Sequence, residues 1–324
     1  MGIPRGTARL LLEEHRHRPF GGRLLQLGRS SVYFGIAELE RWASRHQVRL
    51  ARGVEVRLSH DPRLARQGCI DDRTFFSLLG FSAVESCDVS AWEGADHLLD
   101  LNRPLPEELA GRFDVVLDPG TTVQLFHLPN VLRNLHALLR PEGRVVHAAL
   151  PSNNHMDLGF FMPCPTLLHD FYEVNRWRLD TELLCEYFPY WHRGRLYTGT
   201  WKAHRYTPGS LDHLSYGRYG GAQAALFVVA TKIAGATGDV VPQIGQYVRS
   251  WEAFAARAGD PAAAAGELLP PPGRGGRSAA TARSFEAFLE RHPALDRLYR
   301  PVKGIKERLR RLLPRRMPPL AGRY

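Results

Sequence analysis

Residues 112–150, RFDVVLDPGTTVQLFHLPNVLRNLHALLRPEGRVVHAAL, decide the fold of this chain. The run FDVVLD is short, apolar and rich in valine, and residues 119–120 (Pro-Gly) end it, which predicts a buried parallel strand. Leucines and valines at helical spacing predict a helix over 122–140, which residues 141–143 (Pro-Glu-Gly) end. Residues 144–150 then predict a second strand. A strand, a helix and a strand joined by short turns form a βαβ unit, whose crossover is almost always right-handed.

This unit resembles part of the class I S-adenosylmethionine (SAM) dependent methyltransferases. FDVVLDPGT, the helix and LLRPEGRVVH are similar to their fourth strand, the following helix and their fifth strand. Such enzymes usually read L-K/R-P-G-G at the turn, and here Glu142 replaces the first glycine. The resemblance implies an α/β fold, a Rossmann-like seven-stranded sheet with helices on both faces, over residues 20–234. It also implies SAM as the cofactor.

The composition fits a folded enzyme. The chain has 324 residues, of which 44% are apolar, enough for a sizeable core. Its four cysteines form no C-x-x-C pair, so we expect buried thiols in a reducing compartment and no metal site. No apolar run approaches the roughly 18–20 residues that span a bilayer, and residues 1–19 do not resemble a signal peptide. We therefore expect a cytoplasmic protein.

The positive charge is concentrated near the carboxyl end. Residues 301–324 carry eight Lys or Arg and one acid, a net +7 of the chain's formal +10. The rest is almost neutral, so a nucleic-acid groove on the main domain is not expected. The segment predicts either a solvated helical tail or a peripheral tether to anionic lipid or an acidic polymer.

The first strand is predicted at residues 24–28 (LLQLG). Methyltransferases commonly continue with a G-x-G-x-G loop, whereas this chain reads LGRSSVYFG. LGRS resembles the LGRQ of a small-molecule and saccharide branch of the family. That resemblance implies that Gly28, Arg29 and Ser30 bind the cofactor, the last two through a guanidinium and a hydroxyl. The alternative is an ordinary strand-to-helix turn capped by a serine.

Acidic residues follow the next two predicted strands. Asp88 ends the strand predicted at 83–89, where nucleotide-binding α/β sheets place an acid that accepts hydrogen bonds from ribose hydroxyls. The alternative is a turn residue that caps the segment SAWEGA, which itself matches the same branch. Asp100 and Leu101 lie at the exit of a strand predicted at 97–101. The resemblance implies that they contact the adenine.

Asp118, Gly120 and Thr121 follow the fourth strand and complete the predicted cofactor-binding set. The acceptor side departs from the branch pattern. Less polar residues replace polar ones at four positions, Val123, Leu158, Met162 and Cys164, and Gln124 stands in place of a histidine. His155 and Asp157 are the candidate catalytic bases. Two interpretations remain open: a reshaped acceptor pocket, or a degenerate methyltransferase-like protein that binds without turnover.

The remaining segments suggest appendages to the sheet. Residues 36–70 are expected to form an insertion or lid, and helices are predicted at 36–45, 71–79, 166–177 and 242–257. Strands are predicted at 178–188 and 224–233, which complete the sheet. Between them, 189–221 is an acceptor-recognising cap or a long loop, and its aromatic residues Tyr190, Trp191, His192, Tyr197 and Trp201 are candidates for stacking on a sugar or aromatic acceptor. A turn and helix over 235–257 lead to a flexible linker at 258–283 and a basic helical tail at 284–324.

The sequence thus predicts a SAM-dependent methyltransferase with a small-molecule or saccharide acceptor. A non-catalytic binding protein is the first alternative. A tail-mediated binder of anionic membrane or nucleic acid is the second.

Overall fold

The computed structural model describes residues 2–188, 190–192, 195–197, 200–215, 219–258, 295 and 317–324. The chain divides into two compact units. The first comprises residues 1–206, 222–242 and 319–324, and the second comprises 207–221 and 243–318. All the strands lie in the first unit, whereas the second contributes the turn η3 (Asp212–Leu214) and the helix α7 (Gly245–Ala258) among the described residues.

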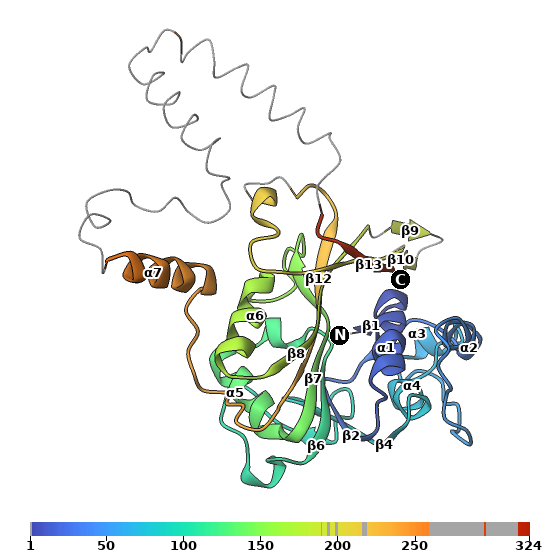
Figure 1. The fold of residues 1–324 in the computed structure, drawn as a ribbon. Coiled ribbons are helices and arrows are strands. Elements are labelled where there is room, and N and C mark those ends of the chain that lie inside the picture. The colour runs from blue at the N-terminus through green and yellow to red at the C-terminus, as the bar shows by residue number, and fades with distance from the viewer. Residues whose placement is uncertain are drawn as a thin grey trace. The chain divides into compact units, whose positions relative to one another are not determined.

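A nine-stranded sheet is the centre of the first unit (Figure 1). In spatial order its strands are β13 (Leu320–Arg323), β11 (Lys202–Arg205), β8 (Arg178–Tyr187), β12 (Gln223–Thr231), β7 (Leu139–Asn153), β6 (Phe113–Asp118), β2 (Gly22–Leu27), β4 (Phe81–Asp88) and β5 (His97–Leu98). The predicted sheet had seven strands. Those seven are present, and β11 and β13 extend the sheet beyond β8 by antiparallel pairing.

The half of the sheet from β7 to β5 is parallel throughout. Its spatial order places the first of these strands in the sequence, β2, between β4 on one side and β6 on the other. This is the strand order of a doubly wound α/β sheet, in which the chain direction across the sheet reverses between β2 and β6. Ligands of such sheets bind outside the carboxyl ends of the strands at this reversal, here called the switch point. The strand β12 then pairs antiparallel with both β7 and β8.

Helices cover both faces of the sheet. Figure 1 shows α1 (Arg5–His17), α2 (Ile36–Arg45) and α4 (Asp72–Leu78) on one side, and α5 (Leu128–Leu138) and α6 (Pro165–Val174) on the other. Three short elements complete the described helices: α3 (Pro62–Ala65), η1 (Glu107–Leu109) and η2 (Thr121–Gln124). Two small pairs of strands lie outside the main sheet, β1 (Gly2–Ile3) with β3 (Ser31–Val32) and β9 (Tyr190–His192) with β10 (Arg195–Tyr197).

The amino-terminal helix and the segment expected to be an insertion or lid both contribute side chains to the core. Leu12 from the amino-terminal helix and Leu39 from the expected insertion are both fully buried in one apolar cluster with the sheet. Trp201 also differs from the prediction, because it is 1% exposed and therefore cannot stack on an acceptor. Its ring stacks on Tyr187 at 4.3 Å and lies directly over Gly6, where an added Cβ would be 2.3 Å from the indole. Gly6 is thus needed for the helix to approach the sheet.

The helix predicted over 122–140 begins later, at Leu128. Pro129 lies in its first turn, where the missing N–H has no cost, and residues 121–124 form the separate turn η2. The sequence pattern merged the two because Leu125 and Val123 continue the apolar spacing.

The carboxyl end forms a strand rather than the predicted helix. The strand β13 pairs with β11, and Trp201 and Tyr324 exchange backbone hydrogen bonds of 2.6 and 2.8 Å. The predicted linker and most of the basic tail lie outside the described residues. Within the described part of the chain, no helix has the length and apolar character needed to cross a membrane.

Candidate functional site

Three predicted site residues meet at the switch point. Gly28, directly after β2, has φ +76°, and a Cβ added there would lie 3.4 Å from Thr121 Oγ1 and 3.7 Å from Asp88 Oδ2. The Gly28 N–H donates to the Cys87 carbonyl at 2.7 Å, and the Thr121 hydroxyl donates to the Leu27 carbonyl. The ends of β2, β4 and β6 are thereby joined around one glycine. The positive φ favours glycine at position 28, whereas a Cβ there would meet both side chains at ordinary van der Waals distances.

Asp88 presents a carboxylate oxygen toward this glycine. Its Oδ1 accepts a hydrogen bond from the Ser90 N–H at 3.0 Å, which orients the side chain. Its Oδ2 accepts no hydrogen bond from the described residues, and the side chain is only partly buried. A carboxylate held in this way can accept hydrogen bonds from a ligand's hydroxyl groups.

Ser30 is fully buried beside this turn. Its hydroxyl oxygen has no hydrogen-bond partner among the described residues, although buried hydroxyls are nearly always paired. A buried water molecule can satisfy such a hydroxyl, and the predicted contact of Ser30 with the cofactor stays a prediction.

Arg29 has a different partner from the one predicted. We expected its guanidinium to face a cofactor carboxylate, but its Nε and NH2 groups donate to Asp72 at 3.2 and 2.5 Å. The Asp72 side chain is fully buried and also accepts from Gln26 Nε2 at 2.9 Å. Burial alone would raise the pKa of Asp72, but the bonds and charge of Arg29 hold it below its usual value. Arg29 therefore anchors the turn after β2 to the start of α4.

Asp118 is also engaged within the protein. It is fully buried, its Oδ1 accepts from the N–H groups of Gly120 and Thr122 at 3.0 and 3.1 Å, and its Oδ2 lies 2.7 Å from His147 Nδ1. His147 Nε2 in turn lies 2.7 Å from the Tyr172 hydroxyl. Asp118 thus shapes the loop that carries Thr121, and it was predicted to contact the cofactor itself.

Asp100 bonds within its own loop, whereas Leu101 is held against α5. The Asp100 carboxylate accepts from the Asn102 N–H at 3.0 Å, which lowers its pKa. Leu101 is 4% exposed, and its carbonyl accepts from the Asn134 and Asn130 side chains at 2.9 and 3.1 Å. No hydrogen bond in the described structure joins these two residues to Gly28, Asp88 or Thr121. Their predicted contact with adenine stays a prediction.

The two candidate bases lie in different environments. His155 is 8% exposed, its Nε2 lies 2.8 Å from the Tyr187 hydroxyl, and burial lowers its pKa. Asp157 is exposed, with φ +59°. No hydrogen bond joins the two side chains in the described structure. His155 is therefore an uncharged imidazole near neutral pH, and Asp157 is the accessible carboxylate.

Exposed apolar side chains lie in the segments that follow β6 and β7. The rings of Phe126 and Phe160 meet edge to face with centroids 5.5 Å apart, and each side chain is about two-thirds exposed. The Phe160 N–H donates to the Val123 carbonyl at 2.8 Å, which fastens the loop after β7 to η2. The same loop exposes Met156, Leu158 and Met162. These residues form the apolar rim, composed of Phe126, Met156, Leu158, Phe160 and Met162.

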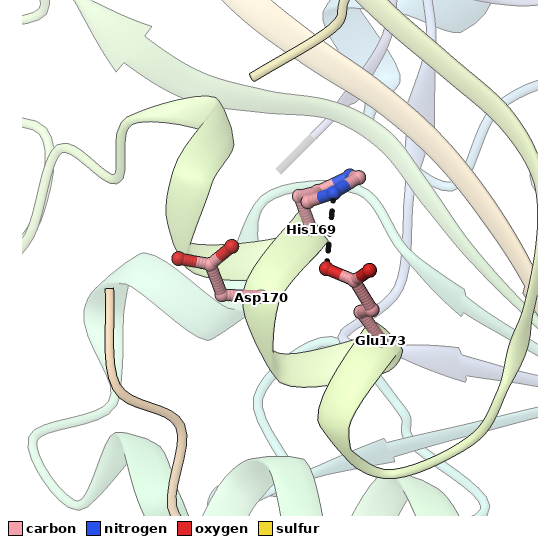
Figure 2. Close-up of side chains that lie close together, drawn as sticks. All are labelled: His169, Asp170 and Glu173. Atoms are coloured by element: carbon pink, nitrogen blue, oxygen red, sulfur yellow. Dashed lines mark ion pairs between the residues drawn. The ribbon is translucent and has the colours of Figure 1, made fainter. Parts of the chain in front are cut away.

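One further cluster contains possible metal ligands. Figure 2 shows His169, Asp170 and Glu173 on α6, whose ligand atoms lie within 4.8 Å of one another. His169 Nδ1 lies 3.0 Å from Glu182 on β8, and its Nε2 lies 3.4 Å from Glu173. The Glu182 hydrogen bond is the main cause of a raised pKa at His169. Since carboxylates already face both ring nitrogens, the cluster links α6 to β8 as an ion-pair network.

Asp72, His147 and Tyr172 were not predicted as site residues. Asp72 was visible only as an acid in the first turn of a helix, and His147 only as a polar residue within a buried strand. A histidine inside an otherwise apolar strand was the one signal that a buried polar partner must exist.

Comparison with known proteins gives only distant likeness. No protein-family model matches the chain, and no curated protein matches its sequence. Among solved structures, a SAM-dependent methyltransferase of Thermotoga maritima, described as a possible histamine N-methyltransferase, is 12% identical over 70% of this chain and 90% of its own, with a TM-score of 0.28.

Two further structures show a similar level of likeness. The 1,6-didemethyltoxoflavin-N1-methyltransferase of Burkholderia thailandensis is 16% identical over 70% of this chain and 76% of its own, with a TM-score of 0.26. The 16S rRNA (adenine(1408)-N(1))-methyltransferase of Catenulisporales acidiphilia is 10% identical over 69% and 93%, with a TM-score of 0.29. With values this low, the case for function depends on the chain's own geometry.

Proposed function

We propose that this chain is a SAM-dependent methyltransferase that acts on a small-molecule or saccharide acceptor. The observation that carries the proposal is the meeting of Gly28, Asp88 and Thr121 at the switch point of a doubly wound sheet. A glycine, an acid and a hydroxyl from three successive strand ends suit a ligand with an adenosine moiety. The sequence motifs after the same strands resemble those of SAM-dependent enzymes.

The residues present fit this cofactor. Asp88 Oδ2 is available to accept hydrogen bonds from the two ribose hydroxyls, and Gly28 lets the backbone approach the ligand closely. SAM supplies an activated methyl group on a sulfonium, so the protein's main task is to hold the acceptor in line with it.

The apolar rim suggests how the acceptor is held. Five exposed apolar side chains beside the switch point favour an acceptor with an apolar or aromatic face, which they would shield from water. Asp157 is the accessible base for an acceptor hydroxyl or amine. An acceptor that is already nucleophilic needs no base.

Isothermal titration with SAM and with S-adenosylhomocysteine tests the proposal. We expect micromolar binding of either ligand, and about tenfold weaker binding by Asp88→Asn, since one charge-assisted hydrogen bond contributes about 1.5–3 kcal/mol. Glu93→Gln, a neutralised acid five residues further along the same loop, is the matched control and should bind as the wild type does. Absence of binding by the wild type, or equal effects of the two substitutions, would contradict the proposal.

A non-catalytic binding protein is the second candidate. It is favoured by the apolar residues that occupy the acceptor side, including Val123, which is buried beneath the loop after β7. The two candidates differ in turnover. Release of S-adenosylhomocysteine from SAM in the presence of aromatic, amine and sugar acceptors supports the enzyme, and cofactor binding with no release from any of them supports the binding protein.

A further inference from the structure

A line of three buried side chains runs from the switch point to the helix α6. Asp118, His147 and Tyr172 come from β6, β7 and α6, and each is 0% exposed. Two contacts of 2.7 Å join them, from Asp118 Oδ2 to His147 Nδ1 and from His147 Nε2 to the Tyr172 hydroxyl. Because all three side chains are fully buried, none of them can touch a ligand directly. We call this row of hydrogen-bonded side chains, which crosses the apolar core, the polar line.

The chemistry of the three groups fixes the direction of each hydrogen bond. Burial raises the pKa of Asp118, but the hydrogen bond from His147 Nδ1 opposes this effect and the pKa is held below its usual value, so the carboxylate can only accept. Burial, followed by the charge of Asp118, raises the pKa of Tyr172 well above its usual value, so its hydroxyl keeps the proton. His147 therefore donates from Nδ1 to Asp118, and in the neutral imidazole Nε2 then carries no proton and accepts from the Tyr172 hydroxyl.

The other carboxylate oxygen of Asp118 holds the loop after β6. It accepts from the N–H groups of Gly120 and Thr122, on either side of Thr121. Gly120 has φ +108°, a conformation that glycine adopts readily. The Thr121 hydroxyl then reaches across to the Leu27 carbonyl at the end of β2. The position of Thr121 beside Gly28 depends on where the Asp118 carboxylate is held.

We propose that His147 and Tyr172 are positioning residues, which fix the Asp118 carboxylate and through it the loop Gly120–Thr122 at the switch point. Tyr172 selects the imidazole tautomer that donates to Asp118. The helix α6 is thereby coupled to the loop Gly120–Thr122, although the hydrogen bond of Tyr172 is with His147 and not with the loop itself. This proposal rests on the proposed function for its effect on the cofactor, but the coupling itself is independent of any ligand.

Tyr172→Phe removes the hydroxyl and little volume, and Tyr206→Phe is its matched control. Tyr206 is 8% exposed, and its hydroxyl also bonds to α6, at Thr166 Oγ1 over 3.2 Å, but it is not part of the polar line. Hydrogen exchange of the peptide spanning residues 119–124 and titration with S-adenosylhomocysteine are measured for both variants and the wild type. A third measurement identifies the tautomer of His147 in the wild type by long-range proton–nitrogen NMR correlation of isotope-labelled histidine. The variant His147→Gln lacks the His147 signals and so assigns them.

In Tyr172→Phe we expect exchange in the loop peptide to be about fivefold faster and S-adenosylhomocysteine to bind about fivefold more weakly, the effect of a lost buried hydrogen bond. Tyr206→Phe should stay within about twofold of the wild type in both measurements, the usual size of an effect without coupling. His147 should carry its proton on Nδ1. Equal behaviour of the two variants, or a proton on Nε2, would overturn the proposal. If the wild type binds no S-adenosylhomocysteine, the proposed function fails. The hydrogen exchange of residues 119–124 and the tautomer of His147 then still test whether α6 is coupled to the loop.

Discussion

Removing the guanidinium of Arg29 should strongly destabilise the fold. The side chains of Arg29 and Asp72 are 11% and 0% exposed, and two hydrogen bonds join them. In Arg29→Met the Asp72 carboxylate would keep only the Gln26 amide as a side-chain donor. Breaking a buried ion pair on one side costs about 3–5 kcal/mol, because a charge is left without compensation. This agrees with about 1.5–3 kcal/mol for each of two charged hydrogen bonds.

Thermal unfolding, followed by the fluorescence of the buried tryptophans, measures this loss. We expect Tm to fall by about 10 °C, at about 2–4 °C for each kcal/mol in a domain of this size. Arg57→Met is the control, because its pair with Glu55 is exposed, at 67% and 75%, and should contribute less than about 1 kcal/mol. The double variant Arg29→Met/Asp72→Leu should recover part of the loss, since no buried charge remains. A Tm change in Arg29→Met no larger than in Arg57→Met would refute the reasoning.

Three further outcomes follow from burial and charge. Burial raises the pKa of Glu13, but the basic neighbours Arg16, His46 and His17 outweigh this effect and lower the pKa to about 2. The contribution of Glu13 to stability is therefore complete above the ordinary carboxyl pKa and is lost as the pH falls from about 4.5 to 2. Glu13→Gln should flatten the dependence of Tm on pH in that window. Cys164 is the one exposed cysteine, and burial raises the pKa of Cys87 to about 12, so a maleimide should label Cys164 first, as peptide mass spectrometry would show, whereas equal labelling of both would contradict this. Gly6→Ala forces a methyl group against Trp201 and should lower stability by about 1–3 kcal/mol in chemical denaturation, whereas an unchanged midpoint would mean that the helix can shift.

The parts of the fold that were predictable are those that hydrophobicity encodes locally. FDVVLD and AALFVVAT are short segments made mostly of apolar residues, which favour a buried strand, so both were correctly predicted as strands of the sheet core. The strands β11 and β13, with sequences KAHR and LAGR, carry no such signal, and they form because each finds an antiparallel partner far along the chain. The predicted count of seven strands therefore missed the two that depend on pairing rather than on composition.

Only those site residues that directly follow parallel strands could be predicted from the sequence. Gly28, Asp88 and Thr121 meet because parallel strands end at the same edge. The partner of Arg29 could not be inferred, since Asp72 lies 43 positions away on a helix whose docking the sequence does not specify. A ligand carboxylate and a protein carboxylate satisfy an arginine equally well, so the motif alone could not distinguish them.

The edge where β13 pairs has a consequence for how the protein reaches its native state. Arg9, in the first helix, donates a hydrogen bond to the Arg323 carbonyl across 314 positions of sequence. Contacts this distant cannot form until the residues up to 323 have left the ribosome, and closing so long a loop slows folding. Until then the nascent sheet has β11 as an unprotected border, open to association with strands of other molecules.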